Sequence, residues 1–382
     1  MRILHVIDRF DPATGGPPEA VRQLIRAAGA RVEAVCLDNP QAEFLGGIGC
    51  PVHALDQSHL GQFAFSPRLG RWLDRNAGRF DGLVMHGLWS YPGLAVRRAA
   101  RRAARPYGVF AHGALDPWFN RQYPRKRLKK QIYWPLQYAV LRDAAAVFFA
   151  TGTERDLAKT SFQPNRWTSV VAPLGLVEEQ DGALDPAGEV EAFYRAWPAL
   201  RDRRFLLFLA RLHEKKGCDL LVEAFARVAP LTPQLDLVLA GPDQAGLQAK
   251  LERRAAELGV AGRVHWPGMI GGAVKWGALR ACEALVLPSH QENFGVSVVE
   301  ALAAGRPVLV SRQVNLWPEI ANDGVGLAEE DTLAGVERLL ARWCAMPADE
   351  RAAMAARARP CFEARFSLAK TIAVIETALA HR

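Results

Sequence analysis

The sequence predicts an α/β protein built from two doubly wound units. Short apolar strands alternate with helical stretches along the 382 residues, and continuous apolar strands of this kind are typical of parallel sheets covered by helices on both faces. An acidic segment with Gly, Ala and Pro, at 176–203, interrupts the alternation. We therefore expect a first domain over 1–175, a linker over 176–203, a second domain over 204–364, and a final helical segment over 365–382.

The individual elements follow from the positions of the apolar runs. Helices are expected between the strands, for example at 17–28 and 91–105, and a last helix at 368–380. The expected strands of the first domain are 2–7, 32–37, 83–86, 107–111, 145–150 and 169–172. Those of the second domain are 205–210, 235–240, 263–266, 284–287 and 307–310. Each domain thus has enough strands for its own Rossmann-like sheet.

Composition narrows the class of protein. No run of 18 uncharged apolar residues occurs, and the N-terminus lacks the pattern of a signal peptide. The six cysteines form no C-x-x-C pair, which favours free thiols in a reducing compartment over disulfides or zinc. We expect a cytoplasmic protein, with peripheral attachment to the inner face of the cell membrane as a further hypothesis.

The net charge of +8 is concentrated in the first half of the chain. Residues 1–175 hold 24 Lys and Arg against 13 Asp and Glu, whereas 176–382 hold 24 against 27. Eleven cations lie between Arg97 and Lys130, interleaved with aromatic side chains. This pattern predicts contact with an anionic membrane surface. A solvated Arg-rich helix face stays open as the alternative; nucleic acid is disfavoured because no binding motif accompanies the charge.

Two glutamates, Glu292 and Glu300, lie eight positions apart in LPSHQENFGVSVVEALAAGRPVLVS. The first falls in the turn after an expected strand, and the second about two turns into the following helix. Free N–H groups at the start of a helix bind phosphate, and a carboxylate two turns further on can reach a ribose diol. The segment therefore predicts a nucleoside diphosphate site.

Other residues at expected strand ends could complete that site. Arg211 and Lys216 follow the strand at 205–210 and could straddle a diphosphate. Without the Glu292–Glu300 segment a solvated basic turn would be the simpler explanation of this pair; with it, the diphosphate is favoured. Gly241 allows close backbone approach after the next strand, but alone it indicates only a turn. His265 and Trp266 could border a nucleobase; a core position for the tryptophan is equally consistent.

The first domain offers a second set of candidates. Gly15 and Gly16 stand between the first strand and a helix, without the G-x-G-x-x-G of a dinucleotide site, so a close approach by phosphate or acceptor competes with a plain turn. His86 and His112 each end a strand, where a cleft is expected, although lone histidines are more often structural. No Asp-x-Asp and no metal-ligand spacing of His and Cys occurs, so no metal and no other cofactor is expected.

Together these residues resemble the retaining glycosyltransferases of family 4, which have the GT-B fold of two Rossmann-like domains facing across a cleft. The E-x7-E pattern of Glu292 and Glu300 carries most of the resemblance, and Arg211, Lys216-Gly217, Gly241-Pro242, Gly15-Gly16 and His112 lie in the matching order. HGLWSYPG and HGALDPW look like segments of bacterial polysaccharide-assembly members. One departure is Asn293, which stands where the family commonly has Gly.

The resemblance implies that the final segment, 365–382, packs back on the first domain, and it implies a role for each site residue. Arg211 and Lys216 would neutralise the diphosphate, Glu300 would bind the ribose, Glu292 would hold donor-sugar hydroxyls, and His112 would lie beside the reacting carbon. The backbone groups implied to bind phosphate are those of Phe294, Gly295 and Val296.

The expected activity is metal-independent transfer of a sugar from a UDP- or GDP-sugar to a hydroxyl of a glycan acceptor, with retention of configuration. The acceptor would be a lipid-linked, polyprenyl-diphosphate glycan in bacterial surface polysaccharide synthesis. Two alternatives stay open: a GT-B epimerase or phosphorylase, and a non-enzymatic nucleic-acid-binding protein. The second alternative leaves Glu292 and Glu300 unexplained.

Overall fold

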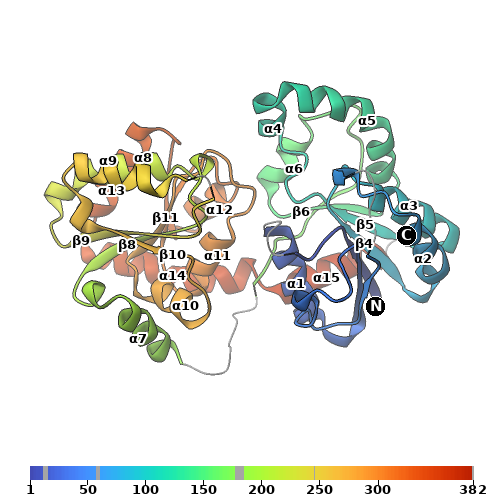
Figure 1. Ribbon diagram of the computed structural model, residues 1–382, viewed down its shortest axis with the longest axis horizontal. Helices are drawn as coiled ribbons and strands as arrows, with labels where there is room; N and C mark the ends of the chain where they lie inside the picture. The colour runs from blue at the N-terminus through green and yellow to red at the C-terminus, as the bar shows by residue number, and fades with distance from the viewer. Residues whose placement is uncertain (12–15, 57–60, 177–184, 245, 381–382) are drawn as a thin grey trace. The chain divides into compact units, whose positions relative to one another are not determined.

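A computed structural model describes residues 1–11, 16–56, 61–176, 185–244 and 246–380 (Figure 1). The chain divides into two units, one formed by Met1–Val177 with Phe366–Arg382 and the other by Glu178–Arg365. Each unit has its own parallel sheet with helices on both sides. The doubly wound α/β fold expected from the sequence is therefore confirmed.

The first unit contains a seven-stranded parallel sheet in the order β3-β2-β1-β4-β5-β6-β7. Most of its strands are fully buried, which explains why they read as unbroken apolar runs. The strands are β1 (Ile3–Ile7), β2 (Val32–Cys36), β3 (Val52–Ala54), β4 (Gly82–His86), β5 (Tyr107–Phe110), β6 (Ala146–Phe149) and β7 (Ser169–Val171).

Helices cover both faces of this sheet. On one face α1 (Gly16–Ala28) packs against α15 (Leu368–Ala380), the last helix of the chain. On the other, α3 (Tyr91–Ala103) packs against both α2 (Pro67–Asn76) and α5 (Pro124–Arg142). The short helices α4 (Pro117–Gln122) and α6 (Gly152–Ala158) follow β5 and β6. Alternate residues of β1 serve the two faces, with Leu4 and Val6 in the core beneath α2 and α3.

The second unit contains a six-stranded parallel sheet in the order β10-β9-β8-β11-β12-β13. Its strands are β8 (Arg204–Leu209), β9 (Leu235–Ala240), β10 (Val264–Gly268), β11 (Ala284–Leu287), β12 (Val308–Ser311) and β13 (Gly326–Glu329). The helices between and after them are α8 (Cys218–Val228), α9 (Gln248–Glu257), α10 (Gly272–Ala281), α11 (Val296–Ala303), α12 (Trp317–Asn322), α13 (Leu333–Ala345) and α14 (Ala348–Arg365).

Part of the segment expected to be a linker is a helix of the second unit. Helix α7 (Pro186–Ala196) is capped at its N-terminus by Asp185, whose side chain accepts a hydrogen bond from the backbone N–H of Gly188 (2.8 Å). It packs closely on α10, because a side chain at Gly277 would clash with the carbonyl oxygen of Glu189. Arg280 also donates to the Glu189 carboxylate (2.6 Å). The expected linker, 176–203, therefore contains a helix of the second unit, and its acidic, Pro-initiated sequence lacks the apolar run that marks a core element.

Candidate functional site

The second sheet places a site where its strand order reverses. Strand β8 lies between β9 and β11, so the chain proceeds outward on one side through β9 and β10 and then resumes on the other side at β11. In open α/β sheets, ligands bind outside the carboxyl ends of the strands at such a switch point. The loops after β8 and β11 carry the residues singled out from the sequence.

Lys216 and Glu292 form an ion pair that joins these two loops. Lys216 ends a short 3-10 turn, and Gly217 follows it with φ +68°. A side chain at Gly217 would lie 2.3 Å from the carbonyl oxygen of Pro288, the residue after β11. Glycine is therefore required for the two loops to approach closely enough for the pair to form.

Glu292 is held from both sides by backbone hydrogen bonds. Its N–H donates to Gln313 (2.9 Å), and its carbonyl accepts from the N–H of Asn315 (3.0 Å). Burial raises the pKa of the Glu292 carboxyl, but the charge and hydrogen bond of Lys216 act against it, with help from Lys215 and the Phe294 N–H. The net result is a pKa below the ordinary value of a glutamate. The site thus contains a half-buried, ionised carboxylate beside an ammonium group.

Arg211 lies at the exposed edge of the same site. It follows β8, and its guanidinium donates to the side chain of Gln244 (2.7 Å) beyond the end of β9. Gly241 makes this arrangement possible: at φ +150° a side chain there would lie 1.9 Å from the carbonyl oxygen of Ala210. The close backbone approach expected at Gly241 is thus made by the protein's own chain.

Helix α11 supplies the remaining groups. Gly295 precedes it with φ +79°, and Val296 is its first residue. Glu300 lies in its second turn, where Lys275 of α10 donates to its carboxylate (2.9 Å). Lys275 could not be predicted from the sequence, because it is an isolated lysine on a separate helix and no spacing pattern connects it with Glu300.

His265 and Trp266 are not gathered with the other residues. The Nε2 atom of His265 is bonded to Asp236 (2.9 Å) in the first half of β9, whereas Gly241 follows the opposite end of that strand. Asp236 is also paired with Arg203. The histidine therefore belongs to an ion cluster away from the Lys216–Glu292 pair, and Trp266 is a partly exposed residue of β10.

The first sheet has a comparable switch point, between β1 and β4. A cleft of about 630 Å³ is lined there by residues that include Asp8, Arg9, His86 and His112. Gly16 is exposed as the first residue of α1, next to the lining residues Pro17 and Pro18. Gly15 lies outside the described residues.

His112 occupies a strained position beside this cleft. Its φ of +47° is rare for a residue with a side chain and costs about 1–2 kcal/mol. The buried Glu154 holds the turn, accepting from the N–H groups of Gly113 and Ala150 (2.7 Å each). Burial also lowers the pKa of His112 to about 4, so the imidazole is neutral at physiological pH. Glu154, not recognised in the sequence, fixes the loop that presents His112.

Across the described ranges, no group of three or more His, Cys, Asp or Glu side chains is arranged to hold a metal ion. Over the same residues, no helix is both long enough and apolar enough to cross a membrane. All six cysteines are free thiols.

Two family models match the chain, one in each unit. Residues 15–175 match the model described as glycosyl transferase 4-like domain, and residues 191–360 match the model described as glycosyl transferases group 1. The start of the second match, at 191, agrees with the assignment of α7 to the second unit.

Curated relatives and solved structures resemble the chain over different lengths. A D-inositol 3-phosphate glycosyltransferase of Frankia alni is 30% identical over 65% of this chain and 62% of its own length. The chain covers 39% of an uncharacterized glycosyltransferase of Methanocaldococcus jannaschii, at 31% identity. It covers 37% of a D-inositol 3-phosphate glycosyltransferase of Geodermatophilus obscurus, at 32% identity. A GDP-mannose:cellobiosyl-diphosphopolyprenol alpha-mannosyltransferase of Xanthomonas campestris is 25% identical over 80% of this chain and 77% of its own length.

Similarity of fold extends over the whole chain. HepE of Anabaena, solved in complex with UDP, has a TM-score of 0.77 at 18% identity, covering 100% of both chains. WaaG, a glycosyltransferase involved in lipopolysaccharide biosynthesis, has a TM-score of 0.70 at 16% identity with the same coverage. With both units matched by family models and the whole fold shared, the chain belongs to the family 4 glycosyltransferases of the GT-B fold.

Proposed function

We propose that this protein transfers a sugar from a UDP- or GDP-sugar to a hydroxyl of a glycan acceptor, with retention of configuration and without a metal. The observation that carries the proposal is the Lys216–Glu292 ion pair across the switch point of the second sheet. A cation and an ionised carboxylate at one ligand-binding edge suit a molecule that has both phosphate and hydroxyl groups. A nucleotide sugar is such a molecule.

The two charges have separate tasks in the reaction. Lys216, with Arg211 at the rim, stabilises the charge that develops on the departing diphosphate. Glu292 accepts hydrogen bonds from hydroxyls of the donor sugar, and Glu300, held by Lys275 of α10, binds the ribose. Gly241, His265 and Trp266 are proposed only as neighbours of the nucleotide. The imidazole of His265 is already bonded to Asp236.

Retention follows from attack on the face that the diphosphate leaves. The bond between the anomeric carbon and the phosphate oxygen breaks, and its electron pair stays on the diphosphate. The acceptor oxygen forms the new bond on the same face, and its proton passes to a diphosphate oxygen. His112 lies beside the reacting carbon in this proposal, and the N–H groups of Gly295 and Val296 bind phosphate at the start of α11.

The names of similar proteins support these donor classes. The Anabaena HepE structures contain UDP and UDP-glucose, and the Xanthomonas relative is named for GDP-mannose and a cellobiosyl-diphosphopolyprenol. We infer an acceptor of the same chemical class, a glycan on a polyprenyl diphosphate, used in surface polysaccharide synthesis at the inner face of the membrane.

The surface expected to meet the membrane is narrower than the range from Arg97 to Lys130. The arginines of α3 are paired locally: Arg97 with Asp143 (2.6 Å), and both Arg98 and Arg102 with Asp74 (3.0 Å each). Residues 121–129, by contrast, are exposed and include five of the cations. We therefore assign membrane contact to α5 and the residues just before it.

Substitution of Lys216 by Ala tests the proposed function. Loss of one charge-assisted contact to the leaving group should lower turnover by about 10²–10³-fold. The variant should remain folded, with a lower melting temperature because Glu292 loses its cation. Turnover would be measured as nucleoside diphosphate released from UDP- and GDP-sugars, with and without EDTA. The matched control is Lys250→Ala on α9, an exposed lysine of the same unit.

Near-wild-type turnover of the Lys216 variant would contradict the site assignment. Loss of activity in EDTA would contradict only the metal-independent part of the proposal. Donor consumption without any acceptor dependence would favour an epimerase instead.

A further inference from the structure

Three histidines form a diagonal row at the first sheet, two on neighbouring strands and one just beyond the end of the next strand. In the parallel register, His5 of β1 lies opposite Val84 of β4, and His86 lies two residues further along β4. His86 in turn lies opposite Phe110 of β5, and His112 follows two residues later. Because residues two apart face the same side of a sheet, the imidazoles of His5 and His86 lie on one face. His112 follows the end of β5 and is joined to them by direct ring contacts.

The three rings are linked in series by hydrogen bonds. His5 Nδ1 and His86 Nε2 are 2.9 Å apart, and His86 Nδ1 and His112 Nε2 are 3.0 Å apart. Successive rings stack with centroids at 5.2 and 5.3 Å, and the Phe110 ring stacks on His86 at 5.4 Å. Only His112 and His86 line the 630 Å³ cleft; His5 is buried behind them.

A neutral row of this kind has only two fully bonded proton arrangements. Burial lowers the pKa of His5 and His112 to about 4 and that of His86 well below its ordinary value, so each ring carries one proton at neutral pH. If His86 carries it on Nδ1, it donates to His112 and accepts from His5. If His86 carries its proton on Nε2 instead, His86 donates to His5 and accepts from His112. The proton position on His112 is therefore tied to that on His5.

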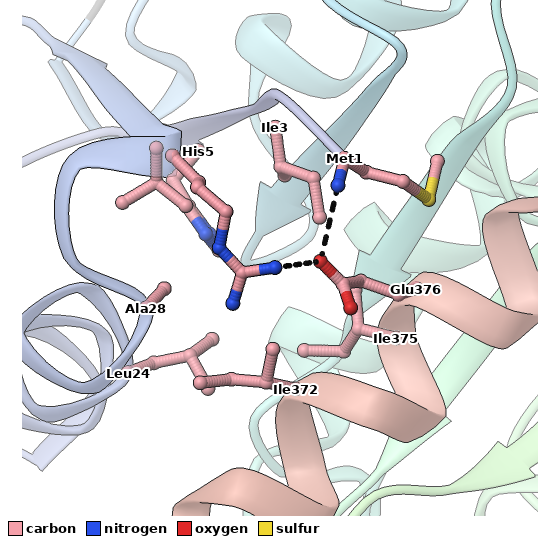
Figure 2. A pocket seen from close by; sticks show the side chains of 10 residues that line it. Met1, Ile3, His5, Leu24, Ala28, Ile372, Ile375 and Glu376 are labelled. Atoms are coloured by element: carbon pink, nitrogen blue, oxygen red, sulfur yellow. Dashed lines mark hydrogen bonds and ion pairs between the residues drawn. The ribbon is translucent and has the colours of Figure 1, made fainter.

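The surroundings of His5 select one of the two arrangements. His5 borders a small pocket that it shares with Met1, Arg31 and Glu376 (Figure 2). The Glu376 carboxylate there already accepts from the N-terminal ammonium (3.3 Å) and from Arg31 (3.1 Å). Both cations contact the same carboxylate oxygen, Oε1. The charged groups that line this pocket with His5 are thus two cations and one carboxylate, a net positive charge. Nδ1 of His5 is bonded to His86, and net positive charge beside the ring favours a lone pair over a proton on the other nitrogen, Nε2. On this electrostatic ground the proton of His5 belongs on Nδ1.

We propose that His5 and His86 are positioning residues that hold His112 in the tautomer with its proton on Nδ1. His112 then presents an N–H donor to the cleft, suited to an oxygen of a sugar hydroxyl or a phosphate. The identity of that ligand rests on the proposed function, whereas the tautomer is a property of the free protein. Removing His5, which lies behind the cleft, should therefore change the chemistry of His112.

Nitrogen-15 NMR of the full chain labelled at histidine tests the wild-type arrangement directly. The expected spectrum shows protons on Nδ1 of all three rings, with couplings across both N–H···N bonds. A proton on Nε2 of His112, or a mixture of the two forms, would overturn the proposal. This measurement needs neither a substrate nor a variant.

The variant His5→Phe tests the coupling. It keeps a ring of similar size but removes the donor to His86, so the His112 signals should shift toward a mixture of tautomers and kcat/KM should fall about 3- to 10-fold. The control His53→Phe removes a histidine on β3 that is bonded to Glu33 instead, and should leave the His112 signals unchanged. Unchanged His112 signals in His5→Phe would overturn the proposal even if no nucleotide sugar proves to be a substrate.

Discussion

At the scale of single residues, Asp8 combines a raised pKa with a place in the cleft of the first unit. It follows β1, lines the cleft, and accepts a hydrogen bond from the Ser90 hydroxyl (3.2 Å). Burial raises its pKa to about 6, although Ser90 and Arg9 act in the opposite direction. A carboxyl with this pKa changes charge close to physiological pH.

The raised pKa predicts a pH-dependent cost to stability. Because the folded value of about 6 exceeds the unfolded value of 3.8, folded protein holds the Asp8 proton more tightly, and its contribution to stability falls as pH rises from about 4 to 6. Above pH 6 the full cost remains. Asp8→Asn should therefore raise the melting temperature at pH 8 by more than at pH 5.

Calorimetry at the two pH values checks this expectation, with the exposed Asp202→Asn as a control that should show no such difference. An equal gain at both pH values, or a loss at pH 8, would show that Asp8 is ionised without a penalty.

Residue partners within one segment were easier to predict than partners that only the fold brings together. Glu292 and Glu300 could be singled out because the strand–turn–helix pattern around them is continuous in sequence. Lys275 could not, since its contact with Glu300 depends on how α10 packs. His5 is a further example: its partner His86 lies 81 positions away on a neighbouring strand.

At the scale of elements, α5 combines cations with an exposed apolar stripe. Leu128, Ile132 and Leu136 recur every four residues and are 62%, 73% and 52% exposed. Side chains four apart share one face of a helix, so the three form a ridge. Exposed cations precede and accompany it, which is the arrangement of a helix that lies in an anionic membrane surface.

The double variant Leu128→Asp/Ile132→Asp should lose binding to vesicles that contain anionic lipid. Burying two such side chains in lipid contributes enough for at least a ~10-fold drop in partitioning when both are removed. Co-sedimentation with anionic and neutral vesicles would measure the loss. The control is Leu231→Asp/Met269→Asp, two residues of the second unit that are each 80% exposed.

Equal sedimentation of both double variants, or equal binding to neutral and anionic vesicles, would remove α5 from the proposed membrane contact.

Buried central strands were predicted well, and short edge strands were not. The expected strands 235–240 and 284–287 coincide with β9 and β11, because both are uniformly apolar and fully buried. Strand β3 has three half-buried residues at one edge of its sheet, and β13 at the edge of the other begins with Gly and ends with Glu. Neither has the apolar run that identifies a buried strand.

At the scale of the whole molecule, the chain uses one topological principle twice. Each sheet reverses its strand order beside its first strand, at β1/β4 and at β8/β11, and each gathers polar residues at that point. The cleft of the first unit has imidazoles and Asp8, whereas the second unit has paired lysines and glutamates. This division suits acceptor chemistry in the first unit and nucleotide binding in the second.

Hydrogen exchange measured with and without UDP or GDP tests the division. Protection should concentrate in the loops after β8, β9 and β11, because those loops contain Arg211, Gly241 and the Lys216–Glu292 pair. Protection confined to the loops after β1 and β4 would show that the nucleotide binds the first unit, which contradicts our proposal. Peptides from α9 and α14 serve as internal references.

The Lys216–Glu292 pair also determines which ligands gain from entering the site. In the free protein each charge has the other as its counter-ion, so the pair is internally neutral. A bare phosphate that takes Lys216 leaves a half-buried carboxylate without its cation, which is costly. A sugar diphosphate compensates by giving Glu292 hydroxyl groups to bind. On the proposed roles, the pair therefore responds to two chemical groups arriving together and discriminates against either one alone.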